Sequence, residues 1–474
     1  MKLYNTLSRQ LDEVTALRPP QVGVYTCGPT VYDYAHIGHW FNYVRMDMLI
    51  RSLKLSGLEP KWVMNITDVG HLVSDADEGE DKLEKGARRE GKTAWEVAEF
   101  YTQDFLAGMQ SLNILTPNHI VKATDHIAEQ IALIQQLEAK GYTYIIDDGV
   151  YYDTSKFEGY AAFARLDLDE QQAGARVAFN QQKRNPTDFA LWKFSPPGQK
   201  RDMEWESPWS PPDGSQRKGF PGWHIECSAM SMKYLGNTLD IHTGGIDHVP
   251  VHHTNEIAQS EAASGQRFAN YWMHGNHVMV NGEKVSKSLG NGIRLQDIVD
   301  KGIEPEVVRL HVLESHYRSQ SRFSWESLEA AGNRLQAYRA MAVRRWQPTS
   351  QQGLSSHQLQ EYRQTIQAAL LHDLDTPQAL TTLSALEGAI DSSGISSDGQ
   401  EAFVELLHWL DAALGLTLAA QADINGEQKQ LLANRQTARD TKDWTKSDEL
   451  RDRLLAQGII VRDGQGGQIW QYSA

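Results

Sequence analysis

The stretch PQVGVYTCGPTVYDYAHIGHW, residues 20–40, predicts how the first part of this chain folds. It begins as a β-strand, because Val22, Val24 and Tyr25 precede a Gly-Pro turn. It ends as a helix, because the apolar residues from Ile37 to Met48 recur three and four positions apart. The sequence therefore predicts a strand that leads through a turn into a helix.

A second strand is predicted after that helix, in PKWVMNITDV at residues 60–69. A strand, a helix and a second strand form the beginning of a βαβ unit, so we expect an α/β fold with a parallel sheet. Further predicted elements are a helix at 124–141, a β-hairpin at 142–155 turned at Asp148-Gly149, a long Pro- and Gly-rich loop at 195–222, strands at 239–245 and 277–285, and helices from about residue 325 to 420.

The composition is that of an ordinary globular protein, with 40% hydrophobic and 23% charged residues among 474. Its net charge of −15 argues against a protein that coats nucleic acid, although a local basic face is compatible with it. The first residues lack the apolar run of a signal peptide. The longest apolar stretch, residues 406–420, contains His408 and Asp411, so we expect a buried helix there and a cytoplasmic protein.

The chain has two cysteines, Cys27 and Cys227. A disulfide is disfavoured in the cytoplasm, and two buried thiols are the simplest interpretation. A metal site is the third interpretation, and it requires ligands from elsewhere.

The segment VHHTNEIAQSEA, residues 251–262, offers such ligands. On a helix, His252 and Glu256 lie four apart on one face, and His253 and Glu256, three apart, are the competing pair. A helix with polar residues and no metal is the alternative. Combined with both cysteines, either pair completes a four-ligand zinc site.

His36 and His39 lie where the first predicted strand meets its helix, at the carboxyl edge of the sheet. A helix N-terminus attracts anions, Gly38 allows close approach of a ligand, and two imidazoles on one turn can donate to phosphate. The alternative is a pair of unrelated surface histidines.

The segment NGEKVSKSLGN, residues 281–291, places Lys284 and Lys287 in a Gly-flanked loop. Two lysines there can neutralise charge on a leaving pyrophosphate, as phosphoryl chemistry requires. The alternative is a solvated basic turn.

Together these residues resemble the cysteinyl-tRNA synthetases, which are class I aminoacyl-tRNA synthetases. HIGH at 36–39 and KVSKS at 284–288 are similar to the two class signatures. DFALWKFS, GWHIECSAMS and HHTNEIAQSEA are similar to further family blocks in the expected order. The resemblance covers residues 2 to about 320, with weaker matches beyond.

The resemblance implies a Rossmann-type parallel-sheet catalytic domain with an insertion, an α-helical bundle and a small C-terminal anticodon-binding module. The expected boundaries are 1–120 and 216–275 for the two catalytic halves, 121–215 for a connective insertion that contacts the acceptor end, 276–325 for the connecting segment with the lysine loop, 326–424 for the bundle and 425–474 for the module.

The resemblance also implies roles for particular residues. Zinc would be held by Cys27, Cys227, His252 and Glu256, one ion per chain, and would bind the substrate thiolate. ATP, with Mg²⁺, would be bound by His36, His39, Lys287 and Asp247, with Lys284 beside them, and the amino acid by Thr67, Trp223 and Asp247. The expected partners are ATP, L-cysteine and cysteine tRNA, and the expected state is a monomer without membrane contact.

The sequence also departs from the usual pattern of these proteins. His248 and Pro250 stand where large apolar residues are more common, Val285 replaces a methionine, and the segments after Asp68 and before Trp223 differ from the usual ones. Two other functions remain open: a cysteine ligase that acts on an amino sugar, and a non-catalytic zinc-dependent RNA-binding relative. About 150 residues after the catalytic core argue against the amino-sugar ligase, and the intact histidine and lysine motifs argue against the non-catalytic relative.

In the C-terminal segment, cations alternate with aromatic and acidic residues. Cations with aromatic rings suit single-stranded bases, whereas interleaved acids suit a salt-bridged helix. The residues concerned are Arg435, Arg439, Lys442, Lys446, Arg451 and Arg453 with Trp444 and Trp470, and the acids Asp440, Asp443, Asp448 and Glu449.

Overall fold

The fold is taken from a computed structural model that describes residues 1–70, 81–165, 180–198, 201–280, 282–284, 292–464 and 467–473. The chain forms two compact units. Unit 1 comprises Met1–Val278, Lys284–Asp297 and Tyr317–Gln320, and unit 2 comprises Met279–Glu283, Ile298–His316 and Ser321–Ala474.

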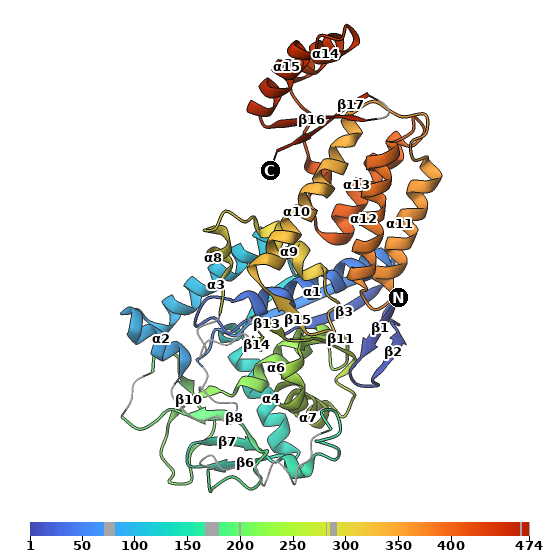
Figure 1. The fold of residues 1–474 in the computed structure, drawn as a ribbon. Helices are drawn as coiled ribbons and strands as arrows, with labels where there is room; N and C mark the ends of the chain where they lie inside the picture. Colours follow the sequence, from blue (N-terminus) through green and yellow to red (C-terminus); the bar gives the residue numbers. More distant parts are fainter. Residues whose placement is uncertain are drawn as a thin grey trace. The chain divides into compact units, whose positions relative to one another are not determined.

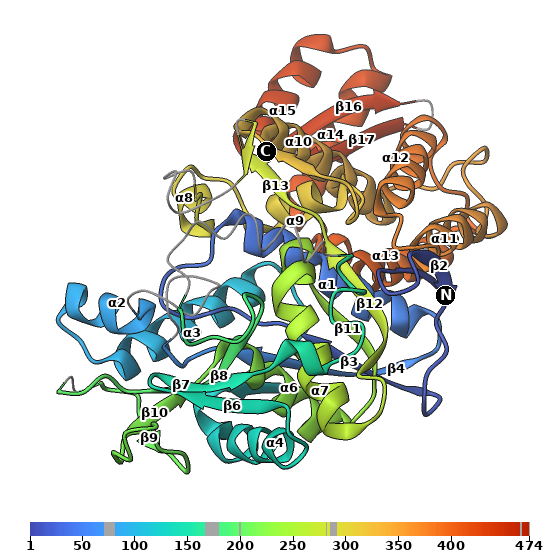
Figure 2. The ribbon, with the colours of Figure 1, turned by 90° about the horizontal axis from the view of Figure 1, so that it is seen from below.

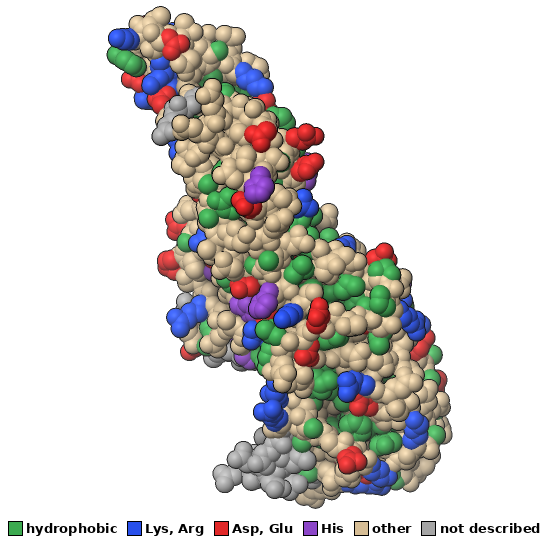
Figure 3. All heavy atoms as spheres, turned by 90° about the vertical axis from the view of Figure 1, so that its right-hand side faces the viewer, with side chains coloured by type: hydrophobic (Ala, Val, Ile, Leu, Met, Phe, Trp, Pro, Cys, Tyr) green, Lys and Arg blue, Asp and Glu red, His purple; other side chains and the backbone are tan. Residues whose placement is uncertain are grey.

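Figure 3 shows acidic and basic side chains interspersed on one face of the molecule, with no large area of a single sign.

The centre of unit 1 is a five-stranded sheet in the order β12-β11-β3-β4-β5, and every neighbouring pair in it is parallel. This arrangement confirms the predicted α/β fold with a parallel, Rossmann-type sheet. Helix α1 contacts β4 and β11, and Figure 2 shows α6 and α7 on the opposite side of the sheet. The elements are β3 (Gln21–Thr26), α1 (Ile37–Leu55), β4 (Glu59–Ile66), β5 (His119–Lys122), α6 (Trp223–Leu235), β11 (Leu239–Gly245), α7 (Thr254–Ser264) and β12 (Ala269–Gly275).

The strand order reverses between β3 and β11. From β3 the chain proceeds outward to β4 and β5, whereas β11 and β12 extend the sheet on the other side. In open parallel sheets, ligands bind outside the carboxyl ends of the strands at such a reversal. The segments that leave β3 and β11 there are Cys27–Val31 and Ile246–His248.

A second, antiparallel sheet of the order β6-β7-β8-β10-β9 lies mostly in the predicted insertion, residues 121–215, but its strand β10 lies beyond that boundary (Figure 1). Its hairpin is present, but the pairing of Ile146 with Gly149 places the turn at Asp147-Asp148, one residue before the predicted position. The Pro- and Gly-rich stretch is not a continuous loop, because two of its segments pair as strands at the edge of this sheet. The strands are β6 (Thr143–Ile146), β7 (Gly149–Tyr152), β8 (Phe189–Phe194), β9 (Trp205–Glu206) and β10 (Lys218–Pro221).

Helices and short strands complete unit 1. Helix α4 covers the insertion side and packs on α6 and α7, so that one apolar cluster continues from the insertion sheet to the parallel sheet. The remaining elements of the first 300 residues are β1 (Lys2–Asn5), β2 (Gln10–Glu13), α2 (Lys82–Glu90), α3 (Ala94–Ser111), α4 (Ile127–Ala139), β13 (Val278–Val280), β14 (Glu283–Lys284) and α8 (Leu295–Val299).

Unit 2 is mainly helical, as predicted for the region after residue 325. Its helices are amphipathic and end at clear signals, such as Asp375 before α12 and the left-handed Gly415 after α13. The helices are α9 (Pro305–Leu313), α10 (Trp325–Ala342), α11 (Ser356–Leu371), α12 (Thr376–Ser393) and α13 (Gln400–Leu414), with the strand β15 (Ser321–Phe323) before α10. Among the described residues, every helix is too short or too polar to cross a lipid bilayer.

The last 50 residues of the chain form a small α/β element with its own apolar cluster. Helices α14 (Gly426–Asp440) and α15 (Trp444–Ala456) pack together, and α15 packs on the hairpin of β16 (Ile459–Gly464) and β17 (Gly467–Tyr472). The segment thus contains two helices and one β-hairpin. Trp470 is buried in the cluster, so its ring is inaccessible to a nucleic-acid base.

Candidate functional site

The candidate site forms at the point where the strand order of the parallel sheet reverses. Cys27 follows β3 directly, and its backbone N–H donates to the carbonyl of Thr243 on β11 at 3.2 Å. Gly28 comes next, and a Cβ there would lie 1.6 Å from the carbonyl oxygen of Asn65, so only glycine fits. The close approach of β3 and β4 at this point places Cys27 at the carboxyl end of the parallel strands.

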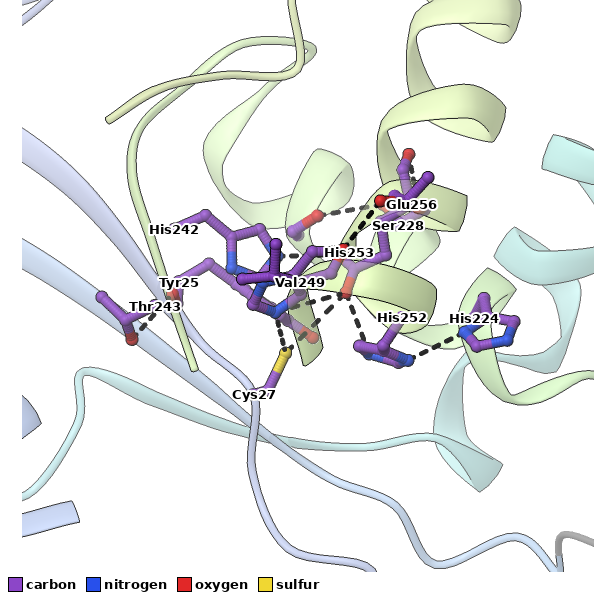
Figure 4. Close-up of polar contacts among 12 residues, drawn as sticks. Tyr25, Cys27, His224, Ser228, His242, Thr243, Val249, His252, His253 and Glu256 are labelled. Atoms are coloured by element: carbon purple, nitrogen blue, oxygen red, sulfur yellow. Dashed lines mark hydrogen bonds and ion pairs between the residues drawn. The ribbon is translucent and has the colours of Figure 1, made fainter. Parts of the chain in front are cut away.

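Four predicted metal ligands converge in this place, and Figure 4 labels three of them, Cys27, His252 and Glu256. One side-chain atom each from Cys27, Cys227, His252 and Glu256 lies within 4.8 Å of every other, and all four residues are buried. The ligands come from three elements: the end of β3, helix α6, and the π-helical turn Val249–His253 that continues into α7. The fold therefore joins cysteines that are 200 positions apart in the sequence.

A second group of four shares two of these residues. Cys27 and Glu256 also lie within 4.8 Å of His242 and His253. The Cys27 sulfur is 3.3 Å from Nε2 of His253, and Glu256 binds Nε2 of His242 at 2.7 Å and Nε2 of His252 at 2.9 Å. Glu256 is thus shared by both groups, and the competing pair noted in the sequence is present in the structure.

Further histidines surround the ligands, and the sequence reasoning missed them. His224 contacts Nδ1 of His252 at 2.9 Å, and His274 contacts Nδ1 of His253 at 2.8 Å. Each contact holds the imidazole by Nδ1 and so orients Nε2 toward the cluster. Residues that contact metal-binding histidines commonly orient them in this way. His242 and His274 lie on the buried strands β11 and β12. An ionisable residue within an otherwise apolar strand is the sequence signal that could have indicated a role for them in the site.

The electrostatics favour an ionised carboxylate at the centre of the cluster and shift the pKa values of the two thiols in opposite directions. Burial alone would raise the pKa of Glu256, but His242 and His252 hold it well below its usual range. Hydrogen bonding with Cys27 lowers the pKa of Cys227 to about 7, whereas burial raises that of Cys27. Burial opposes protonation of His252, yet Glu256 and Cys227 raise its pKa to about 10.

These side chains fit a divalent metal ion. Two thiols, an imidazole and a carboxylate are a donor set that zinc accepts, and thiolates favour zinc over magnesium or calcium. The carboxylate is fully buried against imidazole nitrogens, which stabilises its charge. The chemistry and the convergence of the four groups therefore agree with the predicted zinc site.

A cavity of about 520 Å³ opens beside the cluster and is lined by Cys27, Cys227 and His252. His36 and His39 line the same cavity from the N-terminus of α1. Their rings stack with centroids 3.7 Å apart, and the His36 N–H donates to Nδ1 of His39 at 3.1 Å. In this geometry neutral His39 carries its proton on Nε2. The histidine pair and the metal-like cluster thus share one cavity.

Two residues that follow the predicted lysine loop contact the N-terminus of α1. The N–H of Ile37 donates to the carbonyl of Ile293 at 2.7 Å, and His36 pairs with Arg294 in an antiparallel bridge. Lys284 lies on the short strand β14, and Lys287 lies outside the described residues. The segment that returns from the loop is therefore held beside α1.

The three predicted pocket residues all line the cavity. Thr67 is buried, and its hydroxyl donates to Glu226 at 3.2 Å. The Trp223 ring packs on His252 with centroids 4.5 Å apart, so it forms a wall next to the metal-like cluster. Asp247 is exposed on the turn after β11.

Comparison with known proteins identifies the family. The family model described as "tRNA synthetases class I (C) catalytic domain" matches residues 13–333, and "Cysteinyl-tRNA ligase anticodon binding domain" matches residues 421–470. "Cysteine--tRNA ligase 1" of Burkholderia lata is 45% identical over 99% of this chain and 96% of its own length. The chain belongs to the cysteine–tRNA ligase family.

Other members of the cysteine–tRNA ligase family match equally completely. The Treponema denticola ligase is 40% identical, with 99% of both chains covered, and the Thermus thermophilus ligase is 41% identical, with 99% of this chain and 98% of its own covered. Among solved structures, Mycobacterium tuberculosis methionyl-tRNA synthetase bound by methionyl-adenylate has a TM-score of 0.60 at 13% identity, covering 87% of this chain and 94% of its own. That similarity supports the class I synthetase fold.

Proposed function

We propose that this chain is a cysteine–tRNA ligase, which activates L-cysteine with ATP and transfers it to the 3′ end of cysteine tRNA. Family membership over the whole length supports this function. The observation that carries it is the convergence of Cys27, Cys227, His252 and Glu256 on one wall of the cavity that His36 and His39 line. A thiol-selective metal site beside a phosphate-binding helix end suits activation of cysteine.

The proposed zinc ligands are Cys27, Cys227, His252 and Glu256, one ion per chain. Zinc held there supplies a soft Lewis acid that binds the substrate thiolate, a bond that the hydroxyl of serine does not match. Trp223, packed on His252, limits the room beside that thiolate. Selectivity would then come from sulfur chemistry in place of a difference in shape, which in an apolar pocket is worth only about 1–3 kcal/mol.

The proposed ATP site lies at the N-terminus of α1. The N–H groups of its first turn and the imidazoles of His36 and His39 supply donors for phosphate oxygens. The neutral His39 would donate from Nε2, since its Nδ1 accepts from His36. The end of the lysine loop is attached at Ile293, so Lys284 and Lys287 are the proposed cations for the leaving magnesium pyrophosphate.

The reaction would follow in two steps. The carboxylate of cysteine attacks the α-phosphorus of ATP, and pyrophosphate leaves. A ribose hydroxyl of the tRNA terminus then attacks the carbonyl carbon of the adenylate, and AMP leaves. Thr67 and Asp247, both on the cavity wall, are the proposed contacts that hold the amino acid and the adenylate during these steps.

We also propose a division of labour along the chain. Residues 1–120 and 216–275 would form the catalytic domain, 121–215 the insertion at the acceptor end, 276–325 the connecting segment, 326–424 the helical bundle and 425–474 the anticodon module. The parallel sheet, the insertion sheet, the helices of unit 2 and the compact C-terminal element support this division. The proposed oligomeric state is a monomer.

The test is ATP–pyrophosphate exchange followed by charging of total tRNA with labelled amino acid. We expect exchange that requires L-cysteine and is at least about a hundredfold slower with L-serine at equal concentration, since the thiolate bond is lost. Labelled cysteine should then appear on tRNA.

Two results would contradict the proposal. Equal rates of exchange with serine and with cysteine would show that the site does not select its substrate through a metal–sulfur bond. Transfer of cysteine to an amino sugar, with none to tRNA, would support a different ligase. A matched control replaces the exposed His357 with Asn, which should leave both reactions unchanged.

A further inference from the structure

His248 is a cavity residue to which the proposed reaction assigns no role. It ends the turn Ile246–His248 after β11 and is half-buried in the cavity wall. Its ring centroid is 5.2 Å from that of His252 and 5.1 Å from that of His253, and it meets the Trp223 ring edge-on. The imidazole therefore lies between the metal-like cluster and the open part of the cavity.

One nitrogen of this ring faces the protein backbone. Nδ1 is buried and has no hydrogen-bond partner within the described part of the chain. A Cβ on Gly244 would lie 2.7 Å from that nitrogen, so the ring occupies space that only a glycine leaves open. Because His248 lines the cavity while Nδ1 is buried, we infer that the opposite edge of the ring, which carries Nε2, faces the cavity.

This orientation determines the tautomer of His248. A buried N–H without an acceptor is costly, so the proton of the neutral ring is disfavoured on Nδ1. The proton belongs on Nε2, where a ligand or water in the cavity can accept it. His248 thus presents a neutral N–H donor close to the proposed zinc ligand His252.

We propose that His248 is a further substrate-binding residue, which donates a hydrogen bond from Nε2 to the carboxylate of the bound amino acid. The inference rests on the proposed function. The thiol of cysteine is assigned to the metal-like cluster and its ammonium is itself a donor, so the carboxylate is the one strong acceptor of the amino acid. A neutral donor orients this carboxylate and leaves it more nucleophilic than a cationic partner would.

The test compares His248→Leu, which removes the donor, with His248→Gln, whose amide nitrogen can reach the position of Nε2. The KM for L-cysteine and for ATP is measured by pyrophosphate exchange. Cysteamine, which has the thiol and the amine of cysteine but no carboxylate, is measured as a competitive inhibitor. Zinc content of each variant is determined in parallel.

We expect His248→Leu to raise the KM for cysteine tenfold or more, the typical loss for a hydrogen bond to a charged group. The KM for ATP, the inhibition constant of cysteamine and the zinc content should stay within twofold of wild type. His248→Gln should restore most of the cysteine affinity, because it supplies a donor again.

Three results would overturn the inference. An unchanged KM for cysteine in His248→Leu would show no contact. An equal loss for cysteamine would place the contact elsewhere than the carboxylate, and a parallel loss of zinc would make His248 a structural or metal-supporting residue. If wild type lacks cysteine-dependent exchange, the proposed function fails first, and this inference fails with it.

Discussion

At the scale of single residues, the central feature is a carboxylate shared by two groups of ligands. Glu256 contacts His242 and His252 within 3 Å, and Cys27 is also a member of both groups. A single ion bound by both cysteines would use His252, whereas an ion bound without Cys227 would use His242 and His253. Thiolate is the softest donor present, so the group with two cysteines is the stronger zinc site.

This choice predicts a difference between His252→Asn and His253→Asn. Both variants retain a polar atom near Nδ1, which contacts His224 or His274, and remove Nε2. Loss of an outer partner costs about 10- to 100-fold in metal affinity, and loss of a direct ligand costs more. We expect His252→Asn to lose more than about a hundredfold in zinc affinity and His253→Asn to lose less. Competition with a chelator measures both, and the opposite order would place the ion in the second group.

At the scale of elements, the end of β4 is held by a buried acid. Asp68 is 4% exposed, and its carboxylate accepts from the N–H and the hydroxyl of Thr124 at 2.9 and 2.6 Å. Burial nevertheless raises the pKa of Asp68 from 3.8 to about 6, because the two hydrogen bonds do not offset the loss of hydration. The connection between β4 and the turn after β5 thus carries an electrostatic penalty at neutral pH.

The predicted consequence is a pH-dependent difference between wild type and Asp68→Asn. The folded acid binds its proton more tightly than the unfolded one, so wild type loses stability as pH rises from about 4 to 6. Asn does not titrate, accepts from the N–H of Thr124 and donates to its hydroxyl. We expect Asp68→Asn to be more stable by about 2–3 kcal/mol at pH 7.5 and nearly equal to wild type at pH 4.

Thermal unfolding of the two proteins across pH 4–8 measures this difference. A constant offset at every pH would show that folding leaves the pKa of Asp68 unchanged. Asp411→Asn provides a comparison, because burial also raises the pKa of Asp411 to about 6. The stability difference from wild type should change with pH in the same direction, on top of a constant loss, because Asp411 accepts two backbone N–H groups and Asn can accept only one.

The predicted positions of helices and strands were correct where the hydrophobic periodicity is strong. They were wrong where the pairing between strands sets the position of a turn or a strand. The spacing in α1 and the cap at Asp375 are local signals, and α1 begins at Ile37, the first residue of the predicted apolar repeat. The hairpin turn was misplaced by one residue, because the pairing register sets it. Strands β9 and β10 lie in a Pro- and Gly-rich stretch, and their pairing partners are visible only in the folded sheet.

At the scale of the whole molecule, the C-terminal element keeps most of its cations in ion pairs. Arg435 and Arg439 contact Asp463, Lys446 contacts Glu449, and Arg451 contacts Asp448 and Asp452. The salt-bridged interpretation therefore describes α15 well. Trp444 is the exception among the aromatic residues, since it is 56% exposed at the start of α15, with the guanidinium of Arg439 5.7 Å from its ring.

An exposed tryptophan beside an arginine suits stacking with a splayed base of tRNA. We expect Trp444→Ala to raise the KM for tRNA about tenfold, since stacking on one base contributes about 1–3 kcal/mol. Pyrophosphate exchange, which needs no tRNA, should not change. Leu455→Ala is the matched control, because Leu455 is 54% exposed on the same helix and lacks a ring. If Trp444→Ala and Leu455→Ala raise the KM for tRNA equally, or if neither variant changes it, stacking on Trp444 is excluded.

The sequence by itself determined the order of strands and helices and the chemical types of the site residues. Periodicity, capping and motif spacing are local properties, so the α/β fold and the candidates Cys27, Cys227 and His252 could be read from the chain. The resemblance to class I synthetases then selected one interpretation among several for each motif. The comparisons confirmed the family, and the roles of the individual residues stay predictions.

Only the tertiary structure decided which of these groups meet. Cys27 and Cys227 come together because helix α6, which carries Cys227, packs on β3, which leads into Cys27, a contact that no local pattern encodes. His242 and His274 belong to buried strands, where a sequence cannot distinguish a packed ring from one that orients a ligand. His248 gained its place because Gly244 leaves room for its ring. These are contacts between distant segments, and packing alone brings them within bonding distance.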